Sequence, residues 1–194
     1  LLAPYCIEQR LEYCKQESEA DFWVFPMLLF DNNTKKAKYY TNLPNEESDL
    51  YRFLRSDLPW SISCVLWSKK MLEHLNGFDE SFPNGQDFDL HLRALWRTTN
   101  YKVYPKSKPD NFYRQHSDSK IYHPKNKSRV LVGIRMLIER NSEKINENPA
   151  RQDIQELKIN LLIYFKYAVK EYLFLKDFRS AKSLLETLGR LKII

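Results

Sequence analysis

The ten-residue run DFWVFPMLLF, at 21–30, constrains the fold of this chain more than any other feature. All of its residues except Asp21 and Pro26 are apolar or aromatic. Such a run suits a strand that is buried on both faces, as in a mostly parallel sheet covered by helices. Pro26 has no N–H to donate to a neighbouring strand, so the strand must lie at an edge, contain a bulge or end early. The run therefore predicts an α/β fold.

The segments around this run alternate between helical and extended patterns. Ser68 can cap a helix over 69–76, and residues 4–18 and 86–99 place apolar side chains at helical spacing. Residues 41–59 read as an acidic loop or a short helix. Short strands are expected at 37–42, 60–68, 101–105 and 110–116.

From about residue 125 onward the pattern is helical throughout. Asn148 and Pro149 suit the cap and first turn of one helix, and a last helix carries apolar residues from Phe178 to Leu191. We therefore divide the chain into an α/β block at 1–124 and a helical extension at 125–194. The extension resembles a single tetratricopeptide-type helix pair, which cannot form a solenoid by itself. It is expected to pack on the block or to mediate formation of a homodimer.

The chain carries a net charge of +6, and most of the excess falls in one segment. Residues 101–140 contain ten Lys or Arg and only three Asp or Glu. This segment can be a solvated basic face, or it can attract phosphates, nucleic acid or an anionic membrane surface. A nucleic-acid site would use aromatic side chains for stacking, namely Tyr101, Tyr104, Phe112, Tyr113 and Tyr122. No recognition-helix, zinc-finger or RNP-like motif supports that reading, so we expect no nucleic-acid partner.

The stretch NGFDESFPNGQDFDLHLRAL, at 76–95, uses two of the four glycines of the chain. Gly77 falls where the preceding helix should end in a left-handed residue, which would turn Phe78 back toward the core. Gly85 follows Asn84 in a second tight turn. Asp87 then stands in the first turn of the next helix, where free N–H groups and the helix dipole favour a carboxylate. That position suits a simple helix cap, and it equally suits a general base that takes a proton from a hydroxyl.

The longer stretch at 66–95 resembles the acceptor half of family 2 glycosyltransferases of the GT-A fold. In that family a Gly-Phe-Asp-Glu turn, here 77–80, is followed by an acidic pair that opens a helix, and here the pair is Gln86 and Asp87. Further matches are Asp89, Leu90 and Arg93. The resemblance implies a partial GT-A-like mixed sheet flanked by helices. It also implies an enzyme that transfers a sugar from a nucleotide diphosphate donor to a hydroxyl acceptor, with inversion.

The same resemblance assigns roles to particular residues. Asp87 is implied as the catalytic base, and Gln86, which replaces the more usual Glu, and Asp79 are implied to bind the acceptor. Trp60 would lie at the mouth of the acceptor site, where its ring can stack on a sugar. The acceptor would be a saccharide or a lipid-linked saccharide.

A second match to this family is FYRQHSDSK, at 112–120. It implies that His116 contacts a divalent metal, Mn or Mg, and that Arg114 and Lys120 neutralise the diphosphate of the donor. The metal-binding Asp-x-Asp motif is expected upstream of Leu1, because the resemblance covers only about 1–120. The chain alone is therefore expected to be an inactive part of a glycosyltransferase that lacks its nucleotide-binding half.

The composition bears on the cellular location as well. The mean hydropathy is −0.59, and no apolar run approaches the roughly 20 residues that a membrane span needs. The three cysteines are odd in number and show no paired spacing, which fits a reducing compartment. We expect a cytoplasmic protein, with peripheral contact at the inner face of the membrane left open. Its closest competing function is that of a helical protein-interaction module.

Overall fold

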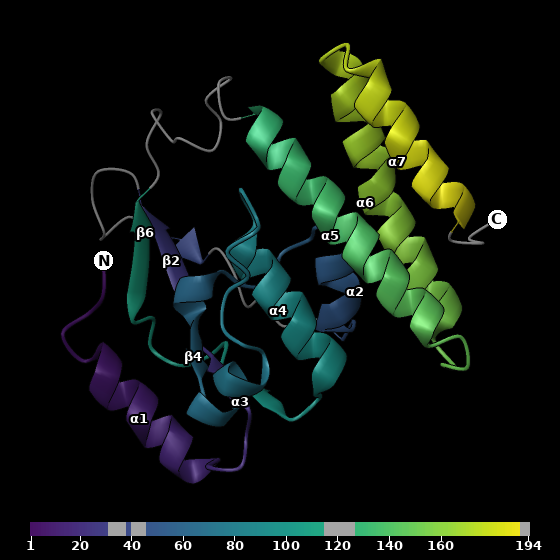
Figure 1. Cartoon of the computed structure of the whole chain (residues 1–194). Coiled ribbons are helices and arrows are strands. Elements are labelled where there is room, and N and C mark those ends of the chain that lie inside the picture. Colours follow the sequence, from purple (N-terminus) through teal and green to yellow (C-terminus); the bar gives the residue numbers. More distant parts are fainter. Residues whose placement is uncertain (31–37, 40–45, 115–126, 191–194) are drawn as a thin grey trace.

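The computed structural model describes residues 1–30, 38–39, 46–114 and 127–190 (Figure 1). The described chain is a mixed α/β structure, in which small sheets and short helices precede three long helices. Strands and helices of the first part lie on the left in Figure 1, and the long helices lie on the right. The fold class predicted from the run at 21–30 is confirmed at this level.

The predicted strand at 21–30 is present, and it is interrupted at Phe25-Pro26. Its halves are β1 (Phe22–Val24) and β2 (Met27–Phe30), and each is the central strand of a three-stranded sheet. β1 pairs antiparallel with one strand and parallel with another, β4 (Val65–Trp67) and β5 (Tyr101–Val103). β2 does the same with β3 (Lys38–Tyr39) and β6 (Asn111–Arg114). The proline thus divides one sequence strand between two mixed sheets.

Both faces of β1 are covered, as the unbroken apolar run predicts. Phe22 and Val24 point into the main core, whereas Trp23 and Phe25 belong to a smaller cluster on the other face. Helix α1 (Cys6–Gln16) contributes Tyr13 to that smaller cluster. Because every residue of β1 is buried, a polar residue anywhere along it would lose its hydration.

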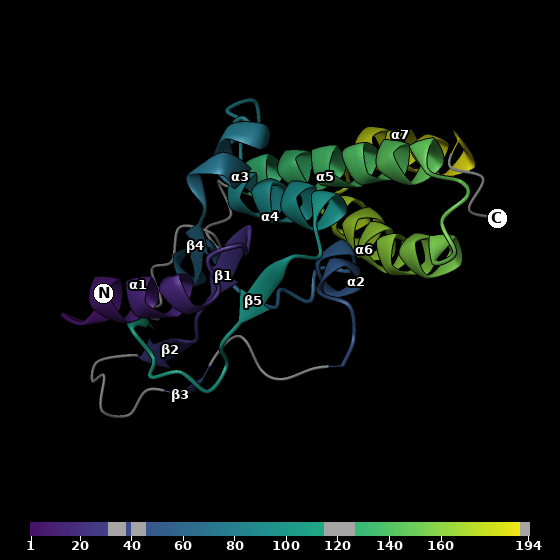
Figure 2. The same ribbon diagram turned by 90° about the horizontal axis from the view of Figure 1, so that it is seen from below.

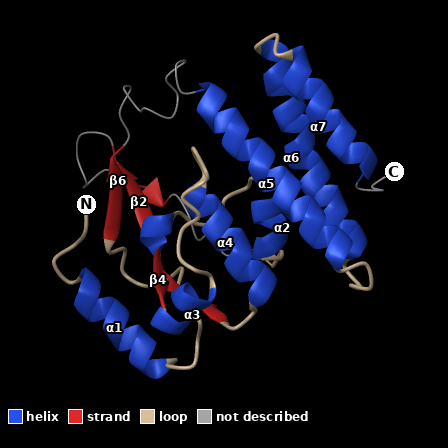
Figure 3. Ribbon diagram, in the orientation of Figure 1, coloured by secondary structure: helices blue, strands red, loops and turns tan. Residues whose placement is uncertain are grey.

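The main core joins the first part of the chain to the long helices. It contains side chains from α2 (Asp49–Leu54), α4 (Gln86–Arg97), α5 (Lys127–Glu147), α6 (Ile154–Phe174) and α7 (Phe178–Arg190). The buried core is therefore continuous across the predicted boundary at 124/125. Leu161 and Phe165 on α6 are both buried inside it, so this face of the helical extension packs internally. Figures 2 and 3 show α6 alongside α5 and α2.

Three local predictions are wrong. The strand expected at 60–68 is reduced to β4, because a 3-10 turn at Ile62–Cys64 precedes it. Phe78 does not return to the core, and half of its surface is exposed (50%). Asn148 and Pro149 do not begin a helix, since Asn148 N–H donates to Ile145 at 3.1 Å and closes the end of α5.

The start of α6 is instead fixed by Asp153. Its carboxylate accepts from the Arg151 guanidinium at 2.7 Å and from the Tyr51 hydroxyl of α2 at 3.0 Å. The bond between Tyr51 and Asp153 joins residues 102 positions apart in the chain, whereas Arg151 and Asp153 are close in sequence. The Asp153 side chain makes no capping hydrogen bond to α6, so its contact with the distant Tyr51 is what fixes this position, and such a contact cannot be read from local sequence.

A glycine in α5 controls how closely this helix approaches the loop before α4. A Cβ added at Gly133 would lie 2.1 Å from the backbone oxygen of Asn84, whereas one at Gly189 in α7 would meet nothing within 4 Å. The backbone at Asn84 leads directly into Gly85 and the start of α4. The packing of α5 thus bears on the segment that contains Asp87.

Gly133→Ala is expected to lower the free energy of unfolding by about 1–3 kcal/mol, the usual cost of overpacking. Gly189→Ala is the matched control, and it should be neutral or stabilise the protein by up to about 1 kcal/mol, since alanine favours the helix. Urea unfolding followed by circular dichroism measures both. Equal effects of the two substitutions would contradict the close contact between α5 and the loop.

A buried histidine in α4 adds a pH-sensitive element to the core. His91 is fully enclosed; its Nδ1 accepts from Trp60 Nε1 at 3.3 Å, and its Nε2 has no hydrogen-bond partner among the described residues. Desolvation by burial lowers the pKa of His91 from 6.5 to about 3. The folded state therefore holds a neutral ring that the unfolded state protonates below pH 6.5.

The free energy of unfolding is therefore expected to be highest above pH 6.5 and to fall as the pH drops toward 5. One such group contributes a slope of about 1.4 kcal/mol per pH unit. His91→Phe removes the titrating group and should flatten the slope between pH 6.5 and 5, even if the variant is less stable overall. His74→Gln, at an exposed histidine, is the control and should keep the slope. A slope that His91→Phe leaves unchanged would refute this assignment.

Candidate functional site

The start of α4 is set by a glycine rather than by a polar cap. Gly85 has φ 85° and ψ 21°, a left-handed conformation that suits glycine. Gly77 has φ 62° at the end of α3 (Lys69–His74), which Ser68 caps through a hydrogen bond from Met71 N–H at 3.1 Å. Both predicted turns are thus confirmed, and they position the loop at 77–85 against the start of α4.

A hollow of about 570 Å³ lies between this loop and the start of α4. It is lined by Ile62, Phe78, Glu80, Gln86 and Asp87. The lining combines two carboxylates, one amide, one aromatic ring and one aliphatic side chain. Carboxylates and amides hydrogen-bond hydroxyl groups, and an aromatic ring packs on apolar C–H groups.

Asp87 is exposed at the edge of this hollow. Its Oδ1 accepts from the adjacent Phe88 N–H at 2.9 Å, which fixes the orientation of the carboxylate. That hydrogen bond uses one oxygen, so Oδ2 can accept a proton or a hydrogen bond from a ligand. The position therefore combines a cap-like bond with access from solvent.

The resemblance also implied Gln86 and Asp79 in acceptor binding, and only Gln86 lines the hollow. Gln86 lines the hollow, and its Nε2 donates to the Phe82 carbonyl at 3.0 Å, so its amide oxygen remains for a ligand. Asp79 does not line the hollow. Its Oδ1 accepts from Ser81 N–H at 2.9 Å and from the Ser81 hydroxyl at 2.6 Å, and its Oδ2 pairs with Arg140 at 2.6 Å.

These contacts give Asp79 a structural function. Hydrogen bonds from Ser81 and from Arg140 hold the pKa of the Asp79 carboxyl well below its usual range. Asp79 thus ties the loop at 77–85 to α5, which carries Arg140. Asp79 does not line the hollow and its oxygens are held by Ser81 and Arg140, so the geometry lends no support to its assignment to acceptor binding, which stays a prediction.

Trp60 also lies elsewhere than predicted. It is only 2% exposed and packs against Phe22 and Phe53, with ring centroids 6.2 Å and 5.1 Å away. Its ring cannot stack on a ligand from solvent. Ile62, two residues later, reaches the hollow instead. Residues 58–63 thus reach the hollow through Ile62, and the buried ring of Trp60 does not line it.

Of the residues assigned to the donor, Arg114 lies within the described part of the chain, and it does not line the hollow. Arg114 is exposed at the end of β6, with its guanidinium 5.5 Å from the centre of the Phe30 ring. His116 and Lys120 lie outside the described residues, so their roles stay predictions. No group of three or more His, Cys, Asp or Glu side chains that could hold a metal ion occurs within 1–30, 46–114 and 128–189. The expected metal, whose Asp-x-Asp motif was placed upstream of Leu1, stays a prediction, and no chemical step is assigned to it.

A buried carboxylate two residues after Asp87 organises the surroundings of the site. Asp89 is 1% exposed, and its Oδ2 accepts from Arg93 Nε at 2.7 Å, while its Oδ1 pairs with Arg140 of α5. Arg93 also donates to the carbonyls of Leu75 and Gly77, the latter at 2.8 Å. Asp89 thus connects α4, α5 and the end of α3.

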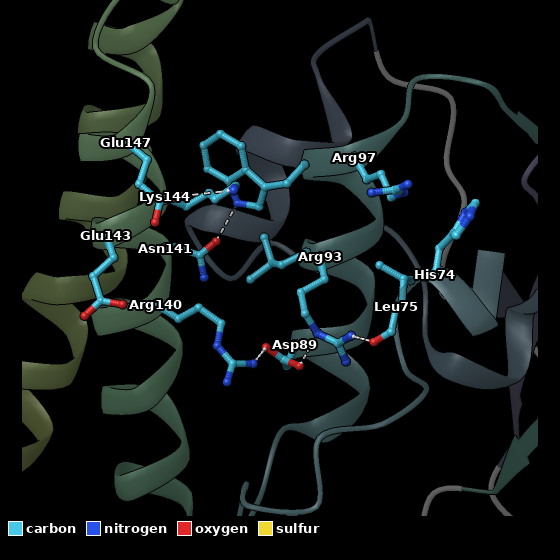
Figure 4. Close-up of a pocket in the computed structure, with 12 residues that line it drawn as sticks. His74, Leu75, Asp89, Arg93, Arg97, Arg140, Asn141, Glu143, Lys144 and Glu147 are labelled. Atoms are coloured by element: carbon cyan, nitrogen blue, oxygen red, sulfur yellow. Dashed lines mark hydrogen bonds and ion pairs between the residues drawn. The ribbon is translucent and has the colours of Figure 1, made fainter.

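Figure 4 shows this network at one end of a groove between α4 and α5, with Arg93 and Arg140 directed at Asp89 from opposite sides. The groove has a volume of about 570 Å³. Trp96 and Asn141 close its middle through a hydrogen bond of 2.7 Å from the indole Nε1. Asp89 and Arg93 are four residues apart on α4 and form the ion pair that this spacing allows, and the buried carboxylate has a second partner, Arg140.

Phe78 and Glu80 complete the candidate site, and sequence reasoning had not given them a firm role. Phe78 was expected in the core, whereas its exposed ring faces the hollow beside Asp87. The exposure of Phe78 depends on the hydrogen bond from Arg93 to the Gly77 carbonyl, because this bond fixes the turn before Phe78. The bond forms only when α4 packs on α3, so the local sequence does not reveal it.

Comparisons with known proteins found no match. No protein-family model, no curated protein and no solved structure is similar to this chain. Among the described residues, no helix is both long enough and apolar enough to cross a membrane. The assignment of a function therefore rests on the residues and geometry of the site.

Asp89 and Asp87 make a matched pair for testing which carboxylate is structural. Asp89→Asn is expected to lower the free energy of unfolding by about 3 kcal/mol, near the lower end for a broken buried ion pair, because both guanidiniums reach solvent. Asp87→Asn should change it by less than about 0.5 kcal/mol, as expected for an exposed residue. Urea unfolding of the two variants measures both changes in the free energy of unfolding. A smaller loss for Asp89→Asn than for Asp87→Asn would contradict the assigned roles.

Proposed function

We propose that the hollow at the start of α4 binds the acceptor of a sugar transfer and that Asp87 deprotonates the acceptor hydroxyl. The observation that carries this proposal is the position of Asp87, exposed at the edge of a lined hollow with one carboxylate oxygen available. The resemblance at 66–95 supports it, because Asp87 is the residue that the family pattern implies as the base. The reaction would be an inverting transfer from a nucleotide diphosphate donor.

The chemistry of the lining suits a saccharide. Glu80 and Gln86 can hydrogen-bond two ring hydroxyls, and Phe78 can pack on the apolar side of a pyranose. Asp87 then lies beside the hydroxyl that reacts. In an inverting transfer that hydroxyl attacks the anomeric carbon, the bond to the diphosphate breaks, and the proton passes to Asp87. The carboxylate is returned when the proton leaves to solvent.

The rigid surroundings explain how this arrangement could be maintained. Positioning of a base and a hydroxyl within reach of each other supplies much of the rate enhancement of such reactions. Here α4 cannot rotate without breaking the Asp89 pairs with Arg93 and Arg140. The catalytic Asp87 and the structural Asp89 are therefore adjacent parts of one helix with separate tasks.

Two of the five aromatic side chains considered for nucleic-acid stacking are used for packing. Tyr101 stacks on Phe22 at 4.7 Å, and its hydroxyl donates to Asp49 at 2.8 Å. Tyr104 packs on Phe25, with ring centroids 5.6 Å apart. Tyr113 is 46% exposed, and Tyr122 lies outside the described residues, so the expectation of no nucleic-acid partner stays a prediction.

Acceptor binding is tested on an array of immobilised mono- and oligosaccharides. The chain is expected to retain a subset of them, and Phe78→Ala should weaken retention by about tenfold, the effect of losing one aromatic contact in a pocket. Phe178→Ala, at an exposed phenylalanine in α7, is the matched control and should bind as the unaltered chain does. Asp87→Asn should retain binding within about threefold, since a base acts mainly in the transition state. Equal binding by all three variants would count against the hollow.

Transfer itself is tested with UDP- and GDP-sugars and the retained saccharides. The resemblance covers only the acceptor half, so the chain alone is expected to show no turnover. Turnover that persists in Asp87→Asn would contradict the proposed base. Turnover that Asp87→Asn abolishes would support the base, and it would show that no separate donor-binding half is required.

A further inference from the structure

The turn between α6 and α7 exposes large apolar side chains that the proposed reaction does not use. All seven residues at 173–179 are exposed. Four of them are large and apolar, Leu173, Phe174, Leu175 and Phe178, and we call these four the apolar tip. Phe174 is 77% exposed and Phe178 is 65% exposed. In Figure 1 this turn forms the uppermost part of the molecule.

Exposed basic side chains lie close to the apolar tip in the sequence. Lys170, Lys176, Arg179 and Lys182 are all exposed, and we call them the basic collar. The two acids within 170–182 are Glu171 and Asp177. The Asp177 carboxylate caps α7, and hydrogen bonds from the Ser180 hydroxyl and from Ser180 N–H, the latter at 3.0 Å, lower its pKa. The collar therefore exceeds the acids by two charges.

The turn is held in a defined shape. Lys176 N–H donates to Leu173 at 3.0 Å and Asp177 N–H donates to Tyr172 at 3.0 Å, the pattern of a capped helix end. The Tyr172 hydroxyl in turn donates to the Leu131 carbonyl of α5 at 2.9 Å. Lys176 is left-handed at φ 58°, a conformation that usually selects glycine or asparagine. The turn that presents the apolar tip is therefore rigid, and its left-handed position is occupied by Lys176.

The adjacent start of α5 has the same character. Val132 and Arg135 of α5 line a hollow together with Leu175 and Asp177, and the charge of Arg135 is paired with that of Glu139 at 2.8 Å. Arg129 is exposed one turn earlier, and Val132 is largely exposed as well. Apolar and basic side chains of the two elements thus lie on the same end of the long helices.

The composition of the apolar tip and the basic collar indicates which class of partner this surface suits. Aromatic and leucine side chains bordered by Lys and Arg are typical of protein surfaces that enter the interface of an anionic bilayer. A second copy of the chain would bring two basic collars of the same sign together, which is unfavourable. An anionic lipid surface complements the collar and receives the apolar tip. We propose that the α6–α7 turn docks this protein on anionic membranes.

In the docked state Phe174 and Phe178 enter the interface between headgroups and acyl chains. The collar lysines and Arg179 lie at the level of the lipid phosphates, and their aliphatic stems pack beside the apolar tip. The proposal does not depend on glycosyl transfer. The chain would dock whether or not the hollow at Asp87 binds a saccharide.

The test is flotation of the chain with vesicles of phosphatidylcholine, with or without about one third phosphatidylglycerol to supply the anionic surface. The unaltered chain should float with the anionic vesicles and much less with the neutral ones. The double variant Phe174→Ser and Phe178→Ser should lose at least about tenfold in partitioning, since two phenylalanine side chains no longer leave water. The double variant Ile7→Ser and Leu11→Ser is the matched control.

Ile7 and Leu11 are 63% and 50% exposed on α1, at the lower end of Figure 1, so their loss should change partitioning by less than about twofold. A separate variant, Lys176→Glu with Arg179→Glu, should remove the preference for anionic vesicles and its sensitivity to salt. Thermal unfolding verifies that each variant is folded. If the serine variants do not fold, the charge variant still decides the proposal.

Three results would overturn the proposal. Equal flotation with neutral and anionic vesicles would show that the collar is not involved, and an equal loss in the Ile7 and Leu11 variant would show a nonspecific apolar effect. The third result concerns self-association, which light scattering coupled to size-exclusion chromatography measures. If the chain forms dimers that Phe174→Ser and Phe178→Ser dissociate, and vesicles bind none of it, a second copy covers the apolar tip.

Discussion

The arrangement of the candidate site depends on one buried carboxylate. Asp89 has lost nearly all contact with water, and such a group is stable only if both oxygens are paired. Arg93 and Arg140 supply those pairs, and each guanidinium has a further task. Arg93 holds two carbonyls at the end of α3, and Arg140 holds Asp79 in the following loop. The single carboxylate therefore fixes α4 against α5 and orients the loop that exposes Phe78.

Most of the elements could be predicted from the sequence, because their causes are local. The apolar run at 21–30 predicted a strand covered on both faces, and Pro26 predicted its interruption. Ser68 and Gly77 marked the two ends of α3. The start of α6 was missed because Asp153 is held by Tyr51, a residue far away in the chain. Distant pairs of this kind leave no periodic pattern in the sequence.

Part of the candidate site could also be predicted, because that part depends on local sequence. Asp87 and Gln86 follow from the turn at Gly85 and from the helix that begins there, and both line the hollow. Trp60 and Asp79 lie away from the hollow because they are held by His91 of α4 and Arg140 of α5, and these contacts form only when the chain folds. Arg140 comes from the helical extension at 125–194, which was expected to pack on the α/β block or to mediate a homodimer. Its pairs with Asp79 and Asp89 join the extension to the block.

The central claim is that Asp87 and the hollow beside it face a saccharide. Two-dimensional amide NMR of the chain, titrated with a saccharide retained on the array, tests it most directly. The account predicts that the amide resonances of Phe78, Glu80, Gln86 and Asp87 shift together and saturate with one affinity. Shifts confined to other parts of the chain, or an absence of shifts at these four residues, would contradict it.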